Sequence, residues 1–426
     1  MNTIARVKIG LTVLLAIALF GCHREETQIE KVVNGQKIYV GSEQCKVCHL
    51  EHYDSWKMTL HSRTIQDVTR NRDALITELN PEIIRADLKK FGNKLKIPVD
   101  EIYIPKIDEI KYTMGVQWKQ RFLMERNGKL YVSPVQYDIW NNTWSPYHEN
   151  DWEKHLWNDR CGGCHVTGLN LEKNTFTEPG VGCESCHGPA SHHVALPKKA
   201  VFDKRLTIVN PSKLSAGIRT QICGGCHSAG KSTKVKDIYW SVGHFPGQAL
   251  GPYFKTVSFD DENVKSVYGD EVPDRHHEQY LDWQKSIHAQ KGVSCTSCHY
   301  VHQLGVPPTQ FQTIKSGSQQ CLSCHTMVKN MYAHSLHAFI NCIGCHMPRV
   351  AKSPESGDVL SHTFRFMSPL KSIEAGGIEK QPNACSNCHH HKNTPVETLA
   401  GFLEAAIKND MPKPFAVHLR PGQSGK

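Results

Sequence analysis

One short pattern, Cys-x-x-Cys-His, contains sixteen of the seventeen cysteines in this chain of 426 residues. Two cysteines three residues apart lie on one face of a helical turn, so both sulfurs can bond the same planar group. The adjacent histidine can then bind a metal at the centre of that group. The eight copies are Cys45, Cys48 and His49; Cys161, Cys164 and His165; Cys183, Cys186 and His187; Cys223, Cys226 and His227; Cys295, Cys298 and His299; Cys321, Cys324 and His325; Cys342, Cys345 and His346; and Cys385, Cys388 and His389.

This chemistry is that of haem c attachment, in which the sulfurs bond the two vinyl groups of a porphyrin and the histidine binds its iron. Zinc ribbons, iron–sulfur sites and thioredoxin-like redox pairs also use Cys-x-x-Cys, but none of them requires the histidine that follows all eight copies. The sequence therefore predicts eight covalently bound haem c groups. Eighteen further histidines and only nine methionines are available as second axial ligands, which favours bis-histidine irons of low reduction potential.

The residues around the first four copies resemble the cytochrome c-554 family, tetrahaem carriers associated with hydroxylamine oxidation. The similar stretches are CKVCH followed by SWKMTLHSRTI, then CGGCHVTGLN, GVGCESCHGPASHHV and CGGCHSAG. The resemblance implies that His61 and His193 are distal ligands. It also implies a five-coordinate iron at the second copy, unless a histidine from the long segment between the first two copies closes it.

The second half resembles the extension found in larger multihaem relatives, on a histidine before GVSCTSCHYVH, the pair CLSCHT and CIGCHMP, and then SHTFRFM and NACSNCH. By this resemblance the distal ligands are His288, His302, His337 and His362. His334 is an alternative to His337, and His276 and His277 are alternatives to His288. The candidates for the remaining irons are His148, His155 and His244.

Successive copies from the second onward begin only 21 to 72 residues apart, which is too short for independent aliphatic cores. The predicted fold is therefore mainly α and irregular, with the haems forming the core. Between the first two copies, residues 72–92 have helical spacing with a restart at Pro81, and Asn127-Gly128 predicts a small β-hairpin element. Five tryptophans cluster around it, either as a small core, which we favour, or as an aromatic wall beside a haem or substrate: Trp118, Trp140, Trp144, Trp152 and Trp157. Thr394-Pro395-Val396-Glu397 predicts a capping box and a final helix to about Lys408.

The first residues predict export, because Arg6 and Lys8 precede an apolar run, Ile9–Leu19, that is too short to span a bilayer. Leu19-Phe20-Gly21-Cys22 resembles a lipobox, which predicts lipidation of Cys22; the alternative is an ordinary cleaved signal with a stray cysteine. The predicted organisation is a signal peptide at 1–21, a lipid tether at 22–36, an N-terminal tetrahaem domain with an insertion at 37–270, and a C-terminal tetrahaem domain with the final helix at 271–426.

The formal charge of +9 does not indicate nucleic-acid binding, because loss of Arg6 and Lys8 with the signal peptide, together with the propionates and irons of eight haems, would bring the oxidised protein near −1. Two functions remain. The favoured one is a carrier that moves electrons from haem to haem, lipid-anchored on the periplasmic side or at the outer membrane, between other multihaem cytochromes or a quinol-oxidising membrane protein. The alternative is a reductase of nitrite, hydroxylamine or tetrathionate at one open haem. Tyr137, Tyr147 and Tyr280 are interpreted as structural.

Overall fold

The computed structural model describes residues 35–257, 267–268, 272–273, 277–302, 311–326, 332–335, 337, 341–352, 357–388 and 390–408. Its helices are short, because most of them contain only one or two turns. They are α3 (Ser42–Lys46), α4 (Leu50–Lys57), α5 (Pro81–Lys89), α6 (Gly163–His165), α7 (Cys183–His187), α8 (Ser191–Ala195), α9 (Val201–Thr207), α10 (Ala216–Gly224), α11 (Gln279–Gln284), α12 (Ile287–Gln290), α13 (Gln319–Leu322), α14 (Tyr332–Ser335), α15 (Cys342–His346), α16 (Pro369–Glu374) and α17 (Val396–Ile407).

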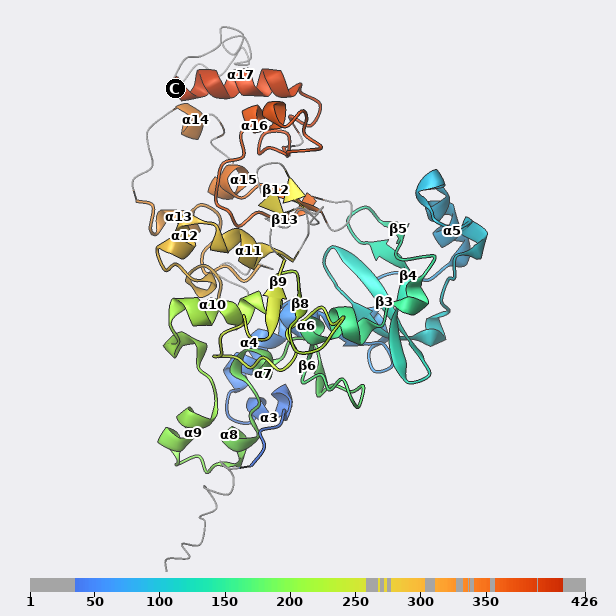
Figure 1. Ribbon diagram of the computed structural model, residues 1–426, viewed down its shortest axis with the longest axis vertical. Helices are drawn as coiled ribbons and strands as arrows, with labels where there is room; N and C mark the ends of the chain where they lie inside the picture. Colours follow the sequence, from blue (N-terminus) through green and yellow to red (C-terminus); the bar gives the residue numbers. More distant parts are fainter. Residues whose placement is uncertain are drawn as a thin grey trace, which may run out of the picture.

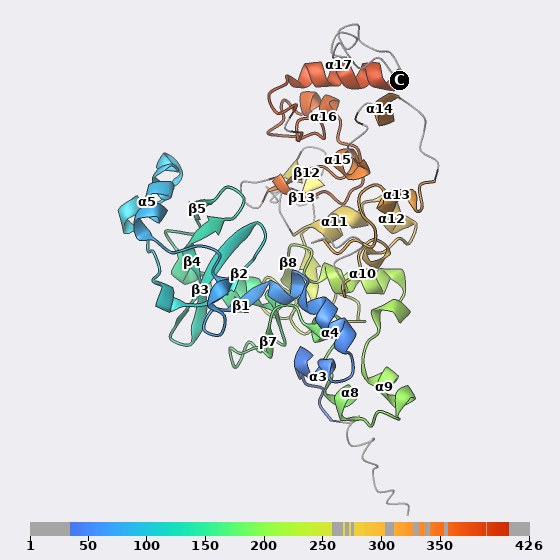
Figure 2. The same cartoon turned by 180° about the vertical axis from the view of Figure 1, so that it is seen from behind.

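The molecule is elongated, with α3, α8 and α9 near one end and α16 and α17 near the other (Figure 1). Helix α17 packs against α16 and α14. A β-sheet stands out from one side of the middle of the molecule, and both views show it beside the column of short helices (Figure 2). Among the described residues, no helix has the length and apolar character needed to cross a bilayer.

The sheet belongs to the segment between the first two copies of the motif. Its antiparallel strands follow in sequence order: β1 (Ile65–Asp67), β2 (Ile110–Met114), β3 (Lys119–Arg126), β4 (Lys129–Asp138) and β5 (Thr143–Pro146). The turn between β3 and β4 consists of Asn127 and Gly128, both with positive φ (52° and 69°), as a two-residue type I′ hairpin requires. The other strands form two-stranded pairs: β6 (Val166–Thr167) with β7 (Glu178–Pro179), β8 (Gly230–Ser232) with β9 (Phe254–Thr256), β10 (Val267–Tyr268) with β11 (Val272–Pro273), and β12 (Arg349–Lys352) with β13 (Gly357–Leu360).

Helix α5 covers one end of this sheet. Asn80 caps it by accepting hydrogen bonds from the backbone N–H groups of Glu82 and Ile83, and Pro81 occupies the first turn. The carboxylate of Asp87 accepts a hydrogen bond from the backbone N–H of Trp144 on β5, at 2.9 Å. Ile84 and Leu88 are fully buried against the sheet, so the insertion has a conventional apolar core.

The apolar core is unevenly distributed along the chain. Two clusters of buried side chains lie in the insertion and the strand that follows it, whereas the third cluster of the described residues contains only Val350 and Met367. The short helices that carry the other copies of the motif thus have few apolar side chains between them. This distribution fits a protein in which large apolar cofactors supply the remaining core.

The mainly α prediction is wrong for the insertion, because the chain mixes helix and sheet and the expected hairpin is part of five strands. Helical spacing over 72–92 yields only a 3-10 turn at Arg72–Ala74 and α5. The capping-box prediction is also wrong: Pro395 is the N-cap of α17, with ψ of 139°, and no side-chain hydrogen bond caps the helix.

The five tryptophans of the insertion divide between the core and the surface. Trp144, Trp152 and Trp157 are buried, as the core interpretation expects. Trp118 and Trp140 stack with their ring centres 5.2 Å apart, and Trp140 is 63% exposed.

Candidate haem-binding sites

The cysteine–histidine copies fold into single helical turns. The backbone N–H of the histidine donates to the carbonyl of the first cysteine in the first copy (2.9 Å), the fourth (2.8 Å), the fifth (3.0 Å) and the sixth (2.9 Å). The third and seventh copies coincide with α7 and α15. In the eighth copy the N–H of Cys388 donates to the carbonyl of Cys385 at 3.0 Å, and His389 lies outside the described residues. This turn places both sulfurs on one side, as attachment to one porphyrin requires.

In each of the two CGGCH copies, a side chain larger than that of glycine would clash with an aromatic ring. A Cβ on Gly163 would lie 2.0 Å from the ring of Trp240, and one on Gly224 would lie 2.8 Å from the ring of Tyr280. Trp240 cannot move aside easily, because it is buried and its Nε1 donates to the carbonyl of Asn158 at 2.8 Å. These aromatic rings pack directly on the motif backbone.

Five motif histidines face a second histidine at a nearly constant separation. If each metal–nitrogen bond is about 2.0 Å and each ring centre lies roughly 1.2 Å beyond its nitrogen, two imidazoles that share one metal have centres about 6.3 Å apart. The observed pairs are His49–His193 at 6.4 Å, His61–His227 at 6.2 Å, His187–His302 at 6.0 Å, His288–His325 at 5.9 Å and His299–His362 at 6.3 Å. Five of the six predicted distal histidines therefore lie where they could share an iron with a motif histidine.

Hydrogen bonds fix the orientation of several of these rings. The Nδ1 atoms of His187, His193, His299 and His362 lie 2.8 to 3.0 Å from the backbone carbonyl oxygens of Val209, Lys204, Phe311 and Leu360. A metal-binding histidine typically uses one ring nitrogen in this way and keeps the other for the metal. Burial also lowers the pKa of His61, His302 and His362 to about 4, so these imidazoles are neutral, which is the form that binds a metal.

The other candidate histidines have different surroundings. His337 lies 6.0 Å from His391, two residues beyond the motif histidine of the eighth copy, and burial followed by the nearby His334 lowers the pKa of His346. The Nε2 of His244 lies 3.1 Å from the carbonyl oxygen of Gln248, and this nitrogen therefore already has a hydrogen-bond partner within the protein.

The remaining candidates from the sequence fall in three places. His276 lies outside the described residues. His277 is close enough to His165 to lower its pKa. His148 and His155 lie beside each other, with ring centres 4.1 Å apart.

Cysteines of different copies lie beside one another and join the eight copies in one succession. A nearby thiol of another copy shifts the pKa of Cys45 (from Cys183), Cys226 (from Cys164), Cys223 (from Cys295) and Cys321 (from Cys342), which connects the first copy with the third, the second with the fourth, the fourth with the fifth and the sixth with the seventh. Electrostatic contacts connect the third with the fourth, the fifth with the sixth and the seventh with the eighth: Cys186–Cys223, Cys298–Cys324 and Cys345–Cys388. The order is first, third, fourth, fifth, sixth, seventh and eighth, with the second copy as a branch on the fourth.

The second copy has distinctive surroundings. His165 belongs to none of the five pairs, and the nearby His277 is one of the groups that lower its pKa. Burial and then Arg121 lower the pKa of His165 to about 4. The Nε of Arg121 donates to Gln136 Oε1 at 2.9 Å, and the guanidinium carbon lies 4.1 Å from the ring centre of Tyr147. A fixed guanidinium of this kind is a donor for a bound anion. Arg121 was not identified from the sequence, because no motif distinguishes it from the other lysines and arginines.

Comparisons with known proteins identify related cytochromes. The family model of cytochrome c552 matches residues 166–334, and that of cytochrome c554 and c-prime matches residues 44–94 and 136–188. The chain is 21% identical over 354 residues to cytochrome c-552 of Aliarcobacter butzleri (strain RM4018), covering 76% of this chain and 64% of that protein. It is 26% identical over 174 residues to the multiheme cytochrome MtrA of Shewanella baltica (strain OS185), covering 40% of this chain and 36% of that protein. The chain thus spans less than two thirds of these curated relatives.

The fold also resembles that of a solved cytochrome. The crystal structure of the outer cell wall cytochrome OcwA matches with a TM-score of 0.66 and 22% identity, covering 86% of each chain. Together with the repeated motif, these similarities show that the protein is a multihaem c-type cytochrome. Its haem is covalently bound haem c, and the predicted resemblance to cytochrome c-554 is confirmed over the two segments that its family model matches.

Proposed function

We propose that the protein is an octahaem electron carrier of the cell envelope. The observation that supports this most directly is the unbroken succession of motif contacts from Cys45 to Cys388. The succession begins at α3, near one end of the elongated molecule, and proceeds toward α16 and α17 at the other (Figure 1).

The residues of the chain have three tasks in this function. The paired cysteines hold each group covalently, and the motif histidine with its facing partner supplies the two axial nitrogens. When bound, each haem supplies an iron that gains or loses one electron, at low potential because no methionine ligand is needed. Backbone carbonyls that hold Nδ1 keep the imidazole planes fixed, so little rearrangement accompanies a change of charge.

The ligand assignment follows from the ring pairs. The distal ligands of the first, third, fourth, fifth and sixth haems are His193, His302, His61, His362 and His288. We assign His334 to the seventh haem, because it lies beside His346, and His337 to the eighth, because it lies beside His391. The two histidines that competed in the sequence therefore serve different irons.

The proposed location is outside the cytoplasm, with the lipid on Cys22 anchoring the chain on the periplasmic side or at the outer membrane. Residues 1–34 are outside the described part of the structure, so this proposal rests on the sequence of the lipobox. The similar fold of OcwA, an outer cell wall cytochrome, is in keeping with it. The proposed partners are other multihaem cytochromes or a quinol-oxidising membrane protein.

Protein-film voltammetry of the purified holoprotein, with a pyridine haemochrome assay, tests the carrier. We expect eight haems per chain and reversible waves that integrate to eight electrons, with no catalytic current when nitrite or hydroxylamine is added. Fewer than eight haems would contradict the cofactor count. A sustained catalytic current with either compound would contradict the carrier function.

One observation favours a second candidate, a reductase at the haem of the second copy. Arg121, held by Gln136 and stacked on Tyr147, places a positive charge beside His165, where an anion such as nitrite could bind. Electron paramagnetic resonance of the oxidised protein distinguishes the candidates. A high-spin ferric signal that nitrite shifts, and that Arg121→Gln makes less sensitive to nitrite, would support the reductase. Low-spin signals that nitrite leaves unchanged would exclude it.

A further inference from the structure

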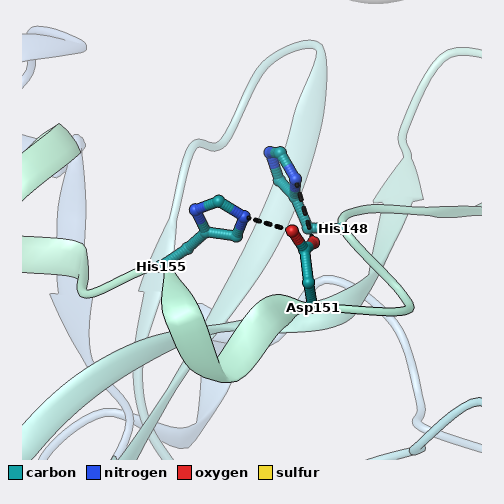
Figure 3. A group of neighbouring side chains, drawn as sticks. All are labelled: His148, Asp151 and His155. Carbon is teal, nitrogen blue, oxygen red and sulfur yellow. Dashed lines mark ion pairs between the residues drawn. The ribbon is translucent and has the colours of Figure 1, made fainter.

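Three side chains with metal-binding atoms converge in the insertion, shortly before the second copy of the haem motif. They are His148, Asp151 and His155, in the turns that follow β5, and Figure 3 shows both imidazoles directed toward the carboxylate. Their ligand atoms all lie within 4.8 Å of one another. His155 Nε2 is 3.2 Å from Asp151 Oδ2, and His148 Nδ1 is 3.6 Å from Asp151 Oδ1.

Although these atoms lie close together, several of them have no hydrogen-bond partner. Both ring nitrogens of His155 and the Oδ1 of Asp151 are buried and have no hydrogen-bond partner. A buried polar atom without a partner is costly and calls for a physical explanation. An ion pair between His155 and Asp151 would engage Nε2 and Oδ2 but would still leave His155 Nδ1 and Asp151 Oδ1 without partners.

A metal ion removes this difficulty. With metal–ligand bonds of about 2.0 to 2.1 Å, tetrahedral ligand atoms lie roughly 3.3 Å apart. The nitrogen–oxygen separations of 3.2 and 3.6 Å, one to each oxygen of the carboxylate, are close to that edge length, and one ligand atom from each residue lies within 4.8 Å of the others. Two imidazoles and one carboxylate suit first-row transition metals, whereas Ca²⁺ and Mg²⁺ prefer sites made of oxygen atoms. Three protein ligands leave a fourth position for water or another small molecule.

The backbone holds the cluster in an unusual conformation. His148 has a φ of 51°, in the left-handed region that residues other than glycine rarely occupy. The backbone N–H of Asp151 donates to the carbonyl of His148 at 3.1 Å, and the N–H of His155 donates to the carbonyl of Trp152 at 3.0 Å. Two consecutive tight turns thus bring residues 148, 151 and 155 to one side.

We propose that His148, Asp151 and His155 bind one divalent transition-metal ion of the class that includes Zn²⁺ and Cu²⁺. The site is separate from the haem ligands proposed above and does not depend on the carrier function. It adjoins the second copy of the haem motif, since the ring of Tyr147 contacts that of His148 at 4.7 Å and packs with Cys161 against the second apolar cluster. The metal would therefore lie on the side of the insertion that faces the branch of the succession.

Zinc analysis of the intact holoprotein tests the proposal. The protein is treated with a chelator, dialysed against Zn²⁺ and then against metal-free buffer, and its zinc and iron are measured together by mass spectrometry. We expect the wild type to retain one more zinc per chain than Asp151→Asn and His155→Gln, at equal iron. His244→Gln is the matched control and should retain the wild-type zinc, since its imidazole lies outside the cluster.

The iron content shows whether each variant has folded and kept its haems, and two different variants guard against misfolding of one of them. Zinc K-edge X-ray absorption of the wild type should show two imidazoles and oxygen ligands without sulfur. Equal zinc in the wild type and both cluster variants, or a zinc site with sulfur ligands, would overturn the proposal. The three side chains would then form only a local polar cluster.

Discussion

The proposed axial pairs can be tested separately, because their imidazole planes differ in angle. The planes of His61 and His227 are 84° apart, whereas those of His49 and His193 are 22° apart. Parallel imidazole planes separate the energies of the two iron d orbitals that overlap with imidazole π electrons, and perpendicular planes leave these energies nearly equal. Ferric haems of the two kinds therefore have different low-spin electron paramagnetic resonance signals, rhombic for parallel planes and strongly anisotropic for perpendicular planes.

The structure gives the size of each effect. Three pairs have planes 9° to 28° apart, and two pairs have planes 78° and 84° apart. Replacing His61 by Ala should remove one haem equivalent from the strongly anisotropic signal and add one equivalent of high-spin iron. Replacing His193 by Ala should instead remove one equivalent from the rhombic signal, with the same high-spin gain. The haem content should not change in either variant, because the motif cysteines are intact.

Spin quantification of the oxidised proteins measures these changes, and added imidazole should restore the low-spin signal by occupying the vacant position. His244→Ala is the control and should leave every signal unchanged. If His61→Ala and His193→Ala remove the same signal, or if neither produces high-spin iron, the facing histidines are not axial pairs and the ligand assignment fails.

Three further changes have defined outcomes. Burial raises the pKa of Asp282 from 3.8 to about 6, so the folded state keeps a proton that the unfolded state loses, and the stability of the wild type should fall as pH rises through this window. Asparagine does not ionise at this position. The free energy of unfolding of Asp282→Asn, measured with guanidinium, should therefore rise relative to that of the wild type by up to about 3 kcal/mol between pH 4 and 7. Gly163→Ala should cost about 1–3 kcal/mol in the same assay, because its Cβ would meet Trp240, whereas Gly225→Ala should cost much less. Cys22→Ser should move the protein from the membrane to the soluble fraction.

Each of these predictions has a contradicting result. A stability difference between Asp282→Asn and the wild type that does not vary with pH would mean that this carboxyl titrates normally. Equal losses in Gly163→Ala and Gly225→Ala would mean that the contact with Trp240 is not the reason for the glycine. Continued membrane association of Cys22→Ser would exclude the lipid anchor.

Local sequence determines the haem sites to a large extent. Each attachment turn is complete within five residues, and a proposed distal histidine such as His193 or His302 lies within a few residues of a copy of the motif. The sequence therefore carries enough information to nominate them, although it does not show which iron each one faces. His302, for example, follows the fifth copy but faces His187 of the third.

Features that depend on tertiary structure could not be predicted in this way. Arg121 on β3 pairs with Gln136 on β4, and the turn after β5 then returns Tyr147 to the same place. The register of the sheet creates this contact, and no sequence motif predicts it. The helical spacing of residues 72–92 was similarly overridden, because packing against the sheet selects only Pro81–Lys89 as helix.

The succession of the eight haem sites is tested most directly by rapid-freeze electron paramagnetic resonance. Fully reduced protein is mixed with less than one equivalent of an oxidant, frozen as early as possible, and compared with a sample left to reach equilibrium, at two protein concentrations. One connected succession predicts the same ratio of rhombic to strongly anisotropic ferric signals in both samples, at either concentration, because electrons redistribute within each molecule before freezing. A ratio that changes slowly after mixing, and faster at higher protein concentration, would mean that separate groups of haems exchange electrons only between molecules, which contradicts the proposed path.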